Sequence, residues 1–138
     1  MTHLDYIGGF KTGNGSQIDD VEEEVLRHYS FNQGDLISQL SLNYLDSIHV
    51  LCEQNAIELV LVCTPVHMKY YNSIPKEVII EFERVLDSYR SKGVRIFDYS
   101  KTDMQDDMFY NSDHLNSIGA NEFSSKLALD FQHLQELE

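Results

Sequence analysis

The chain has 138 residues, of which 42% are hydrophobic and 11% aromatic, and its formal net charge is −13. This length favours one domain, with a core that buries roughly 70% of the surface of the unfolded chain. The acidic balance argues against nucleic acid and anionic membranes as partners, because a phosphate surface attracts a basic protein.

The sequence shows no segment of the kinds that direct export or anchor a chain in a membrane. No apolar run approaches the ~20 residues of a membrane span. The N-terminal residues lack the basic and apolar regions of a signal peptide, so we expect a cytoplasmic protein as far as the given sequence goes. Cys52 and Cys63 have apolar neighbours and no metal-type spacing, which predicts buried free thiols. No cofactor is expected.

Residues 1–30 form a loop-rich, acidic lead-in. Gly and Asn supply turn signals in its first half. The acidic residues that follow are combined with only a weak apolar face, so residues 19–30 are predicted to form a solvated helix or a linker.

Beyond that lead-in, helical and strand-like patterns alternate. Apolar residues at helical spacing predict helices over residues 35–54, 73–92 and 117–137. Two short apolar runs, 58–63 and 94–99, predict the buried strands of a parallel sheet. Strand-plus-helix units of ~35 residues imply right-handed crossovers between these strands.

The helix over residues 35–54 is expected to bury one apolar stripe. Asn32 or Asp35 is a candidate cap for this helix, and Ser73 is a candidate cap for the next one. The stripe of the helix over residues 35–54 consists of Ile37, Leu40, Tyr44, Ile48 and Leu51.

Residues 66–72 are predicted to form a loop at the carboxyl end of the first strand.

The predicted fold class is α/β: a partial three-layer α/β/α (flavodoxin-like) parallel sheet flanked by helices, in a single domain over residues 1–138. Two strands are few for a sheet, which usually has ~5. A further strand is expected from the N-terminal segment, from residues upstream or from another chain. An open sheet edge would favour pairing into a homo-oligomer.

The polar stretch over residues 109–120 is the first candidate site, because ligands bind beyond the carboxyl ends of strands in open α/β sheets. His114 follows Asp113, and a histidine in such a loop can act as a general base if a carboxylate orients it. Taken alone, an exposed loop histidine is the commoner explanation. Asp113 is also explained as a charge favoured at a helix start.

Two further groups of polar residues lie near this stretch. His67 and Tyr70, in the loop after the first strand, are candidates for substrate binding because they lie at the same edge of the sheet. The acidic loop of residues 103–113 does not match a calcium-binding EF-hand loop that begins at Asp103. Position 6 is Met108 where an EF-hand has Gly, and position 12 is His114 where it has Glu. No metal site is therefore predicted.

The pattern Asp-His-Leu-Asn-x-x-Gly-Ala-x-x-Phe over residues 113–123 resembles the C-terminal block of SGNH (GDSL-type) hydrolases. Residues 59–67 and 94–98 resemble the strands that precede that block. The resemblance implies a three-layer α/β/α fold and an acyl-ester hydrolase or carbohydrate O-acyl transferase, with a small acyl ester or a carbohydrate as ligand. It implies that Asn116 is a helix cap. Gly119 and Ala120 predict a close approach of the last helix to the sheet.

By the same resemblance, His114 matches the catalytic base, but two features of the family are missing. The triad acid, three residues before the base, is Asn111 here, and an Asp-to-Asn change in a triad costs about 10⁴ in rate. The chain also contains no Gly-Asp-Ser nucleophile block and no Gly-x-Asn-Asp block. Asp113 replaces the acid only if the loop turns it inward.

Two hypotheses follow, beside a third idea of a metal-binding domain built on the acidic loop of residues 103–113. The chain is either an SGNH-hydrolase-like domain that is incomplete or inactive without its nucleophile, or a non-catalytic binding or assembly module of the same fold. Whether it is an enzyme stays open at this point.

Overall fold

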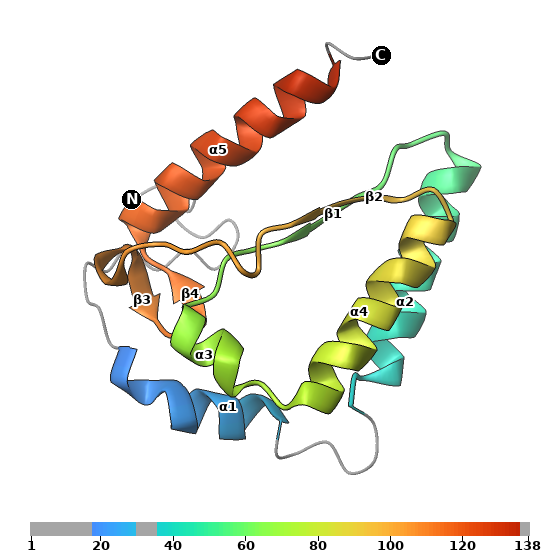
Figure 1. The fold of residues 1–138 in the computed structure, drawn as a ribbon. Coiled ribbons are helices and arrows are strands. Elements are labelled where there is room, and N and C mark those ends of the chain that lie inside the picture. The colour runs from blue at the N-terminus through green and yellow to red at the C-terminus, as the bar shows by residue number, and fades with distance from the viewer. Residues whose placement is uncertain (1–17, 30–35, 136–138) are drawn as a thin grey trace, which may run out of the picture.

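The computed structural model describes residues 18–29 and 36–135, and it is mixed α/β (Figure 1). Short helical and extended segments alternate along the chain, as the sequence pattern predicts. The helices are α1 (Val21–Tyr29), α2 (Gln39–Gln54), α3 (Met68–Ser73), α4 (Lys76–Ser91) and α5 (Ser117–Gln135). The strands are β1 (Val60–Cys63), β2 (Arg95–Asp98), β3 (Phe109–Asn111) and β4 (His114–Leu115), and two 3-10 turns, η1 (Ile18–Asp20) and η2 (Asp106–Met108), complete the set.

The two predicted strands are present and pair in parallel. Strand β1 lies beside β2, with Val60 opposite Arg95 and Cys63 opposite Asp98. Strands β3 and β4 form a separate antiparallel pair. The described residues therefore contain two sheets of two strands each, and a full three-layer flavodoxin-like sheet is not shown. The expected N-terminal strand falls mainly on residues 1–17, which lie outside the described residues.

Helices lie on both sides of the β1–β2 sheet (Figure 1). On one side, Phe97 packs against Phe131 of α5, with ring centroids 5.0 Å apart. Tyr99, just beyond β2, meets Phe123 of the same helix at 5.2 Å, and its hydroxyl donates to Asp130 at 2.6 Å. These contacts use the α5 face that the apolar spacing predicts. Helices α2 and α4 lie side by side on the opposite side of the sheet.

The predicted burial of the α2 stripe is wrong. Helix α2 turns a different face toward α4: His49 is buried against the ring of Tyr89, whose hydroxyl donates to Asp46 at 2.8 Å. Helical spacing identifies an apolar face, but burial needs a neighbour, and the described residues place none over most of this face. The exposed stripe residues are Leu40 (64%), Tyr44 (63%), Ile48 (49%) and Leu51 (59%).

The predicted loop after β1 contains helix α3 instead. His67 caps this helix, since its Nδ1 accepts from the backbone N–H of Lys69. Ser73 is the last residue of α3 and does not cap α4, which begins after Pro75 without a side-chain cap. Likewise, Ser38 caps α2 in place of the predicted Asn32 or Asp35. At the starts of α2 and α3 these polar side chains accept from backbone donors that have no partner within the helix.

A hairpin replaces part of the predicted acidic loop and carries the candidate base. Strands β3 and β4 pair across it, with Asn111 opposite His114. Asn116 follows, and its Oδ1 accepts from the backbone N–H groups of Ile118 and Gly119, which confirms the predicted cap of α5. A Cβ on Gly119 would lie 2.2 Å from the carbonyl oxygen of Met108. The predicted close approach is thus real, although its partner is the 3-10 turn before β3.

Candidate functional site

The hairpin turn brings the three predicted catalytic residues together. The Nδ1 of His114 lies 3.0 Å from Oδ1 of Asn111 and 2.9 Å from Oδ1 of Asp113. The Asp113 side chain is only 6% exposed, whereas that of His114 is 64% exposed. The turn therefore directs the carboxylate inward, which is the condition under which Asp113 can orient the histidine.

This arrangement divides the two ring nitrogens of His114 between two tasks. Nδ1 is held at the hairpin by the oxygens of Asn111 and Asp113. Nε2 is then the nitrogen that can exchange a proton with a reacting group, as in other histidines held by a carboxylate. Asp113 places beside Nδ1 a negative charge that the amide of Asn111 does not have.

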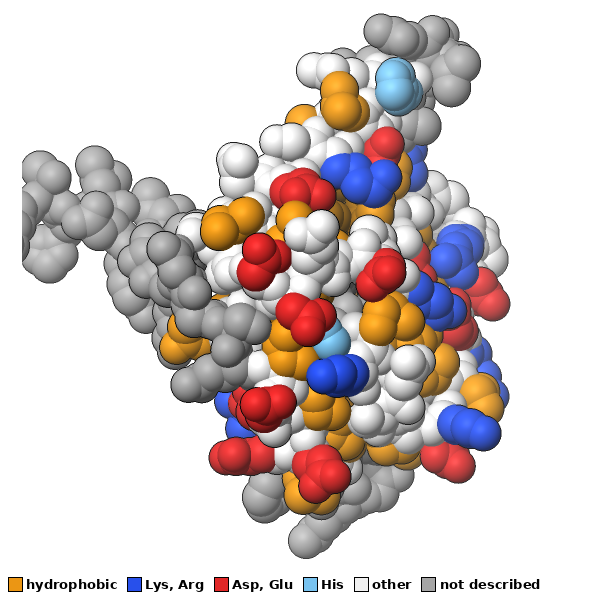
Figure 2. All heavy atoms as spheres, turned by 60° about the vertical axis from the view of Figure 1, so that its left-hand side comes forward, with side chains coloured by type: hydrophobic (Ala, Val, Ile, Leu, Met, Phe, Trp, Pro, Cys, Tyr) orange, Lys and Arg blue, Asp and Glu red, His pale blue; other side chains and the backbone are white. Residues whose placement is uncertain are grey.

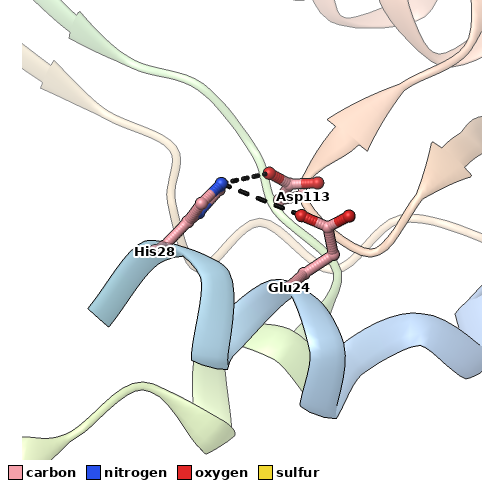
Figure 3. Close-up of side chains that lie close together, drawn as sticks. All are labelled: Glu24, His28 and Asp113. Carbon is pink, nitrogen blue, oxygen red and sulfur yellow. Dashed lines mark ion pairs between the residues drawn. The ribbon is translucent and has the colours of Figure 1, made fainter. Parts of the chain in front are cut away.

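The second oxygen of Asp113 faces helix α1 (Figure 3). Its Oδ2 lies 3.5 Å from Nε2 of His28 and 3.9 Å from Nη2 of Arg27. Glu24, one helical turn before His28, points to the same place, with Oε2 3.8 Å from His28 Nε2, and it also pairs with Arg27. Two carboxylates, an imidazole and a guanidinium therefore meet between α1 and the hairpin.

Tyr70 contacts the ring nitrogen of His28 that faces away from the two carboxylates. Its side chain is buried, and its hydroxyl oxygen lies 2.7 Å from Nδ1 of His28 while donating to the hydroxyl of Tyr29 at 3.3 Å. Burial, the hydrogen bond with Tyr29 and the nearby negative charges of Asp113 and Glu24 raise the pKa of Tyr70. The hydroxyl therefore stays neutral, within hydrogen-bond distance of the His28 ring.

His67 takes part in a different set of contacts. It is buried, its Nδ1 caps α3, and its Nε2 lies 3.1 Å from Oδ1 of Asp106. Its ring meets Phe109 edge-on, with centroids 5.1 Å apart, and its backbone N–H donates to the carbonyl of Ser112. Both ring nitrogens are thus engaged within the fold. Substrate binding by His67 and Tyr70 stays a prediction, and of the two only Tyr70 lines the cavity described next.

A cavity of about 600 Å³ opens beside the carboxyl end of β1. Its walls are mainly apolar, and a polar end is formed by His28, Tyr70 and Asp113. In open α/β sheets the crevice beyond the strand ends is the usual ligand site. The other lining residues are Tyr29, Leu36, Ile37, Ser38, Val62, Cys63, Thr64, Val66, Tyr71, Ile74, Val78, Ile79, Phe82 and Ser100.

Cys63 is the thiol in this cavity wall, and it is a poor nucleophile. Burial, followed by the negative charge of Asp98, raises its pKa to about 11. At neutral pH the reactive thiolate is therefore scarce. Both cysteines are free thiols, as predicted, although each is half-buried.

Sequence reasoning missed Glu24 and His28, because they lie in the segment predicted to be a solvated helix or linker. Their spacing of four residues places them on one helix face, and that was the available signal. What the sequence did not indicate is the pairing of α1 with the hairpin. Figure 2 shows acidic side chains spread over this side of the molecule, so the charge alone does not mark the cluster.

Comparison with known proteins found no matching family model, no similar curated protein and no similar solved structure. Within the described part of the chain, none of the helices has the length and apolar character needed to cross a membrane.

Proposed function

We propose that this chain is the base-bearing part of an acyl-ester hydrolase domain of the SGNH type, with His114 as the general base. The observation that supports this most directly is the placement of His114 Nδ1 within 3.0 Å of side-chain oxygens of both Asn111 and Asp113. In this proposal Asp113 supplies the carboxylate charge that the amide at position 111 lacks.

The proposed chemistry is proton transfer through Nε2 of His114. The base takes a proton from a nucleophile as the nucleophile attacks the ester carbonyl, and it returns the proton to the leaving alcohol. The nucleophile is a serine of a Gly-Asp-Ser block that this chain does not contain, and water takes its place in this chain alone. The substrate class is a small acyl ester or an acylated carbohydrate.

The proposal extends to the sheet. In a complete three-layer α/β/α fold, a further parallel strand would pair with the edge of β1 that β2 leaves open. Among the described residues β1 pairs with β2 alone, which leaves its other edge open for such a strand.

Hydrolysis of p-nitrophenyl acetate by the purified chain tests the role of His114. We expect nitrophenol release above the buffer rate, reduced to the buffer rate by His114→Ala and reduced at least ten-fold by Asp113→Asn. His133→Ala removes another exposed histidine, on α5, and serves as the matched control with an unchanged rate. Release that survives His114→Ala, or no release by the unmodified chain, would contradict the proposal.

A second candidate is a non-catalytic assembly module, which the exposed stripe of α2 favours. Leu40, Tyr44, Ile48 and Leu51 place four large apolar side chains on one helix face. Exposed apolar patches of this kind often mark protein interfaces. Homo-oligomer formation through this face would appear in light scattering after size exclusion, and Ile48→Glu should abolish it. Ile80→Glu, at an exposed position of α4, is the matched control.

A further inference from the structure

Glu24, His28 and Asp113 converge on one point between α1 and the β3–β4 turn (Figure 3). One potential ligand atom from each lies within 4.8 Å of the others, and among the described residues this is the one group of three metal-ligating side chains so arranged. The side chains of Glu24 and Asp113 are 13% and 6% exposed, so water solvates the two carboxylates only weakly. Partly buried carboxylates are stabilised when a cation lies between them.

The distances within the group fit a shared ion better than direct bonding. His28 Nε2 lies 3.5 Å from Asp113 Oδ2 and 3.8 Å from Glu24 Oε2, and both separations are long for a charge-assisted hydrogen bond. Ligands at about 2.0–2.1 Å from a tetrahedral zinc ion lie about 3.3–3.4 Å apart. The two separations from His28 therefore require only a small contraction around an ion, while the three ligand atoms together lie within 4.8 Å.

Tyr70 sets the orientation that a metal-binding histidine needs. Its hydroxyl oxygen lies 2.7 Å from Nδ1 of His28, and when His28 binds an ion through Nε2, Nδ1 carries the ring proton and donates it to this oxygen. This tautomer leaves the lone pair on Nε2, the nitrogen that faces the two carboxylates. A hydrogen bond on the remote ring nitrogen is the usual support of a ligating histidine.

Two other side chains touch the group. The guanidinium of Arg27 pairs with Glu24 and lies 3.9 Å from Asp113 Oδ2, so it supplies positive charge where an ion would bind. The Arg27 side chain is 55% exposed, so it is free to turn outward when an ion replaces it. His114 holds Oδ1 of Asp113 and leaves Oδ2 for the ion.

We propose that Glu24, His28 and Asp113 bind a divalent transition-metal ion of the zinc class. One imidazole with two carboxylates suits Zn²⁺ better than Ca²⁺ or Mg²⁺, which prefer oxygen ligands alone. Three protein ligands leave a fourth position, and His28 and Asp113 both line the cavity described above. A ligand in that cavity can therefore reach the ion. The site does not depend on the proposed esterase function.

Isothermal titration of the full chain with Zn²⁺ tests the site. We expect one-site binding, weakened at least ten-fold by Glu24→Gln, His28→Ala or Asp113→Asn. Tyr70→Phe should weaken binding by roughly ten-fold, since outer partners of metal ligands commonly contribute this much. Glu53→Gln removes the exposed carboxylate that lies 3.7 Å from the buried His49 and is the matched control, with unchanged affinity expected.

Arg27→Ala separates ion binding from a purely structural charge cluster. Removing the competing guanidinium should tighten Zn²⁺ binding by several-fold, a result that partial unfolding does not produce. The proposal is overturned if the unmodified chain binds no Zn²⁺, if Glu53→Gln weakens binding as much as Glu24→Gln, or if Arg27→Ala fails to tighten it. Far-UV circular dichroism of each variant checks that the chain remains folded.

Discussion

Asn116 holds the helix start and the hairpin that carries His114, and replacing it should destabilise both. Its Oδ1 accepts from the backbone N–H groups of Ile118 and Gly119, at 2.9 and 3.1 Å. Its Nδ2 donates to the carbonyls of Asp107 and Phe109, at 2.6 and 3.3 Å. The side chain is 1% exposed, so water does not replace these bonds readily when the amide is removed.

The cost of Asn116→Ala follows from these four hydrogen bonds. Loss of the cap costs about 1 kcal/mol. A buried carbonyl left without a donor adds about 1–3 kcal/mol. We therefore expect Asn116→Ala to lower the free energy of unfolding by about 3 kcal/mol, a large part of the 5–15 kcal/mol typical of a domain. Asn116→Ser keeps a capping oxygen and should lose about 1 kcal/mol less.

Urea unfolding followed by circular dichroism measures the effect of Asn116→Ala as a shift of the midpoint at constant slope. Asn121→Ala, at an exposed position of the same helix, is the matched control and should change stability by less than about 0.5 kcal/mol. If Asn116→Ala costs no more than Asn121→Ala, the four hydrogen bonds do not stabilise the folded chain and the reasoning fails.

Two further predictions concern α5 and its contacts. Gly119→Ala should destabilise the chain by about 2 kcal/mol or more in the same unfolding assay, because its Cβ would lie 2.2 Å from a backbone oxygen; a stabilised variant would contradict this, since alanine normally favours a helix. Burial and the hydrogen bond to Asp130 raise the pKa of Tyr99 to about 12, so its neutral hydroxyl stabilises the fold below pH about 10 and this stabilisation is lost toward pH 12. Tyr99→Phe should flatten part of the decline of the urea midpoint over that range, leaving the contributions of Tyr70, Tyr89 and Cys63, and an unchanged decline would refute the assignment.

Local chemistry explains the parts of the fold that the sequence predicted. β-branched runs became the parallel strands β1 and β2. The polar Asn116 became a cap and Gly119 a point of close approach, because these functions depend on residues only a few positions away. Helix α4 likewise buries Val78, Leu86 and Tyr89 of its apolar stripe, and α5 buries Phe123.

The parts that escaped prediction depend on which elements meet in space. Helical spacing located the α2 stripe, but burial requires a neighbour, and α4 contacts the face that bears His49 instead. The cluster at Glu24 and His28 needs α1 to lie against a turn more than 80 residues away. For the same reason the orienter of His114 was left open, since only the inward turn of the hairpin shows that Asp113 reaches it.

Asp113 links the two proposals, because each uses one of its oxygens. Oδ1 orients His114, and Oδ2 faces His28 and the proposed ion. A bound zinc ion would draw negative charge away from Oδ1 and weaken the support of the imidazolium. We therefore expect Zn²⁺ to slow nitrophenyl acetate hydrolysis by the unmodified chain. It should have little effect on Glu24→Gln, which keeps Asp113 and His114 but loses one metal ligand. Equal inhibition of both proteins would show that zinc acts elsewhere, for example directly on the exposed His114.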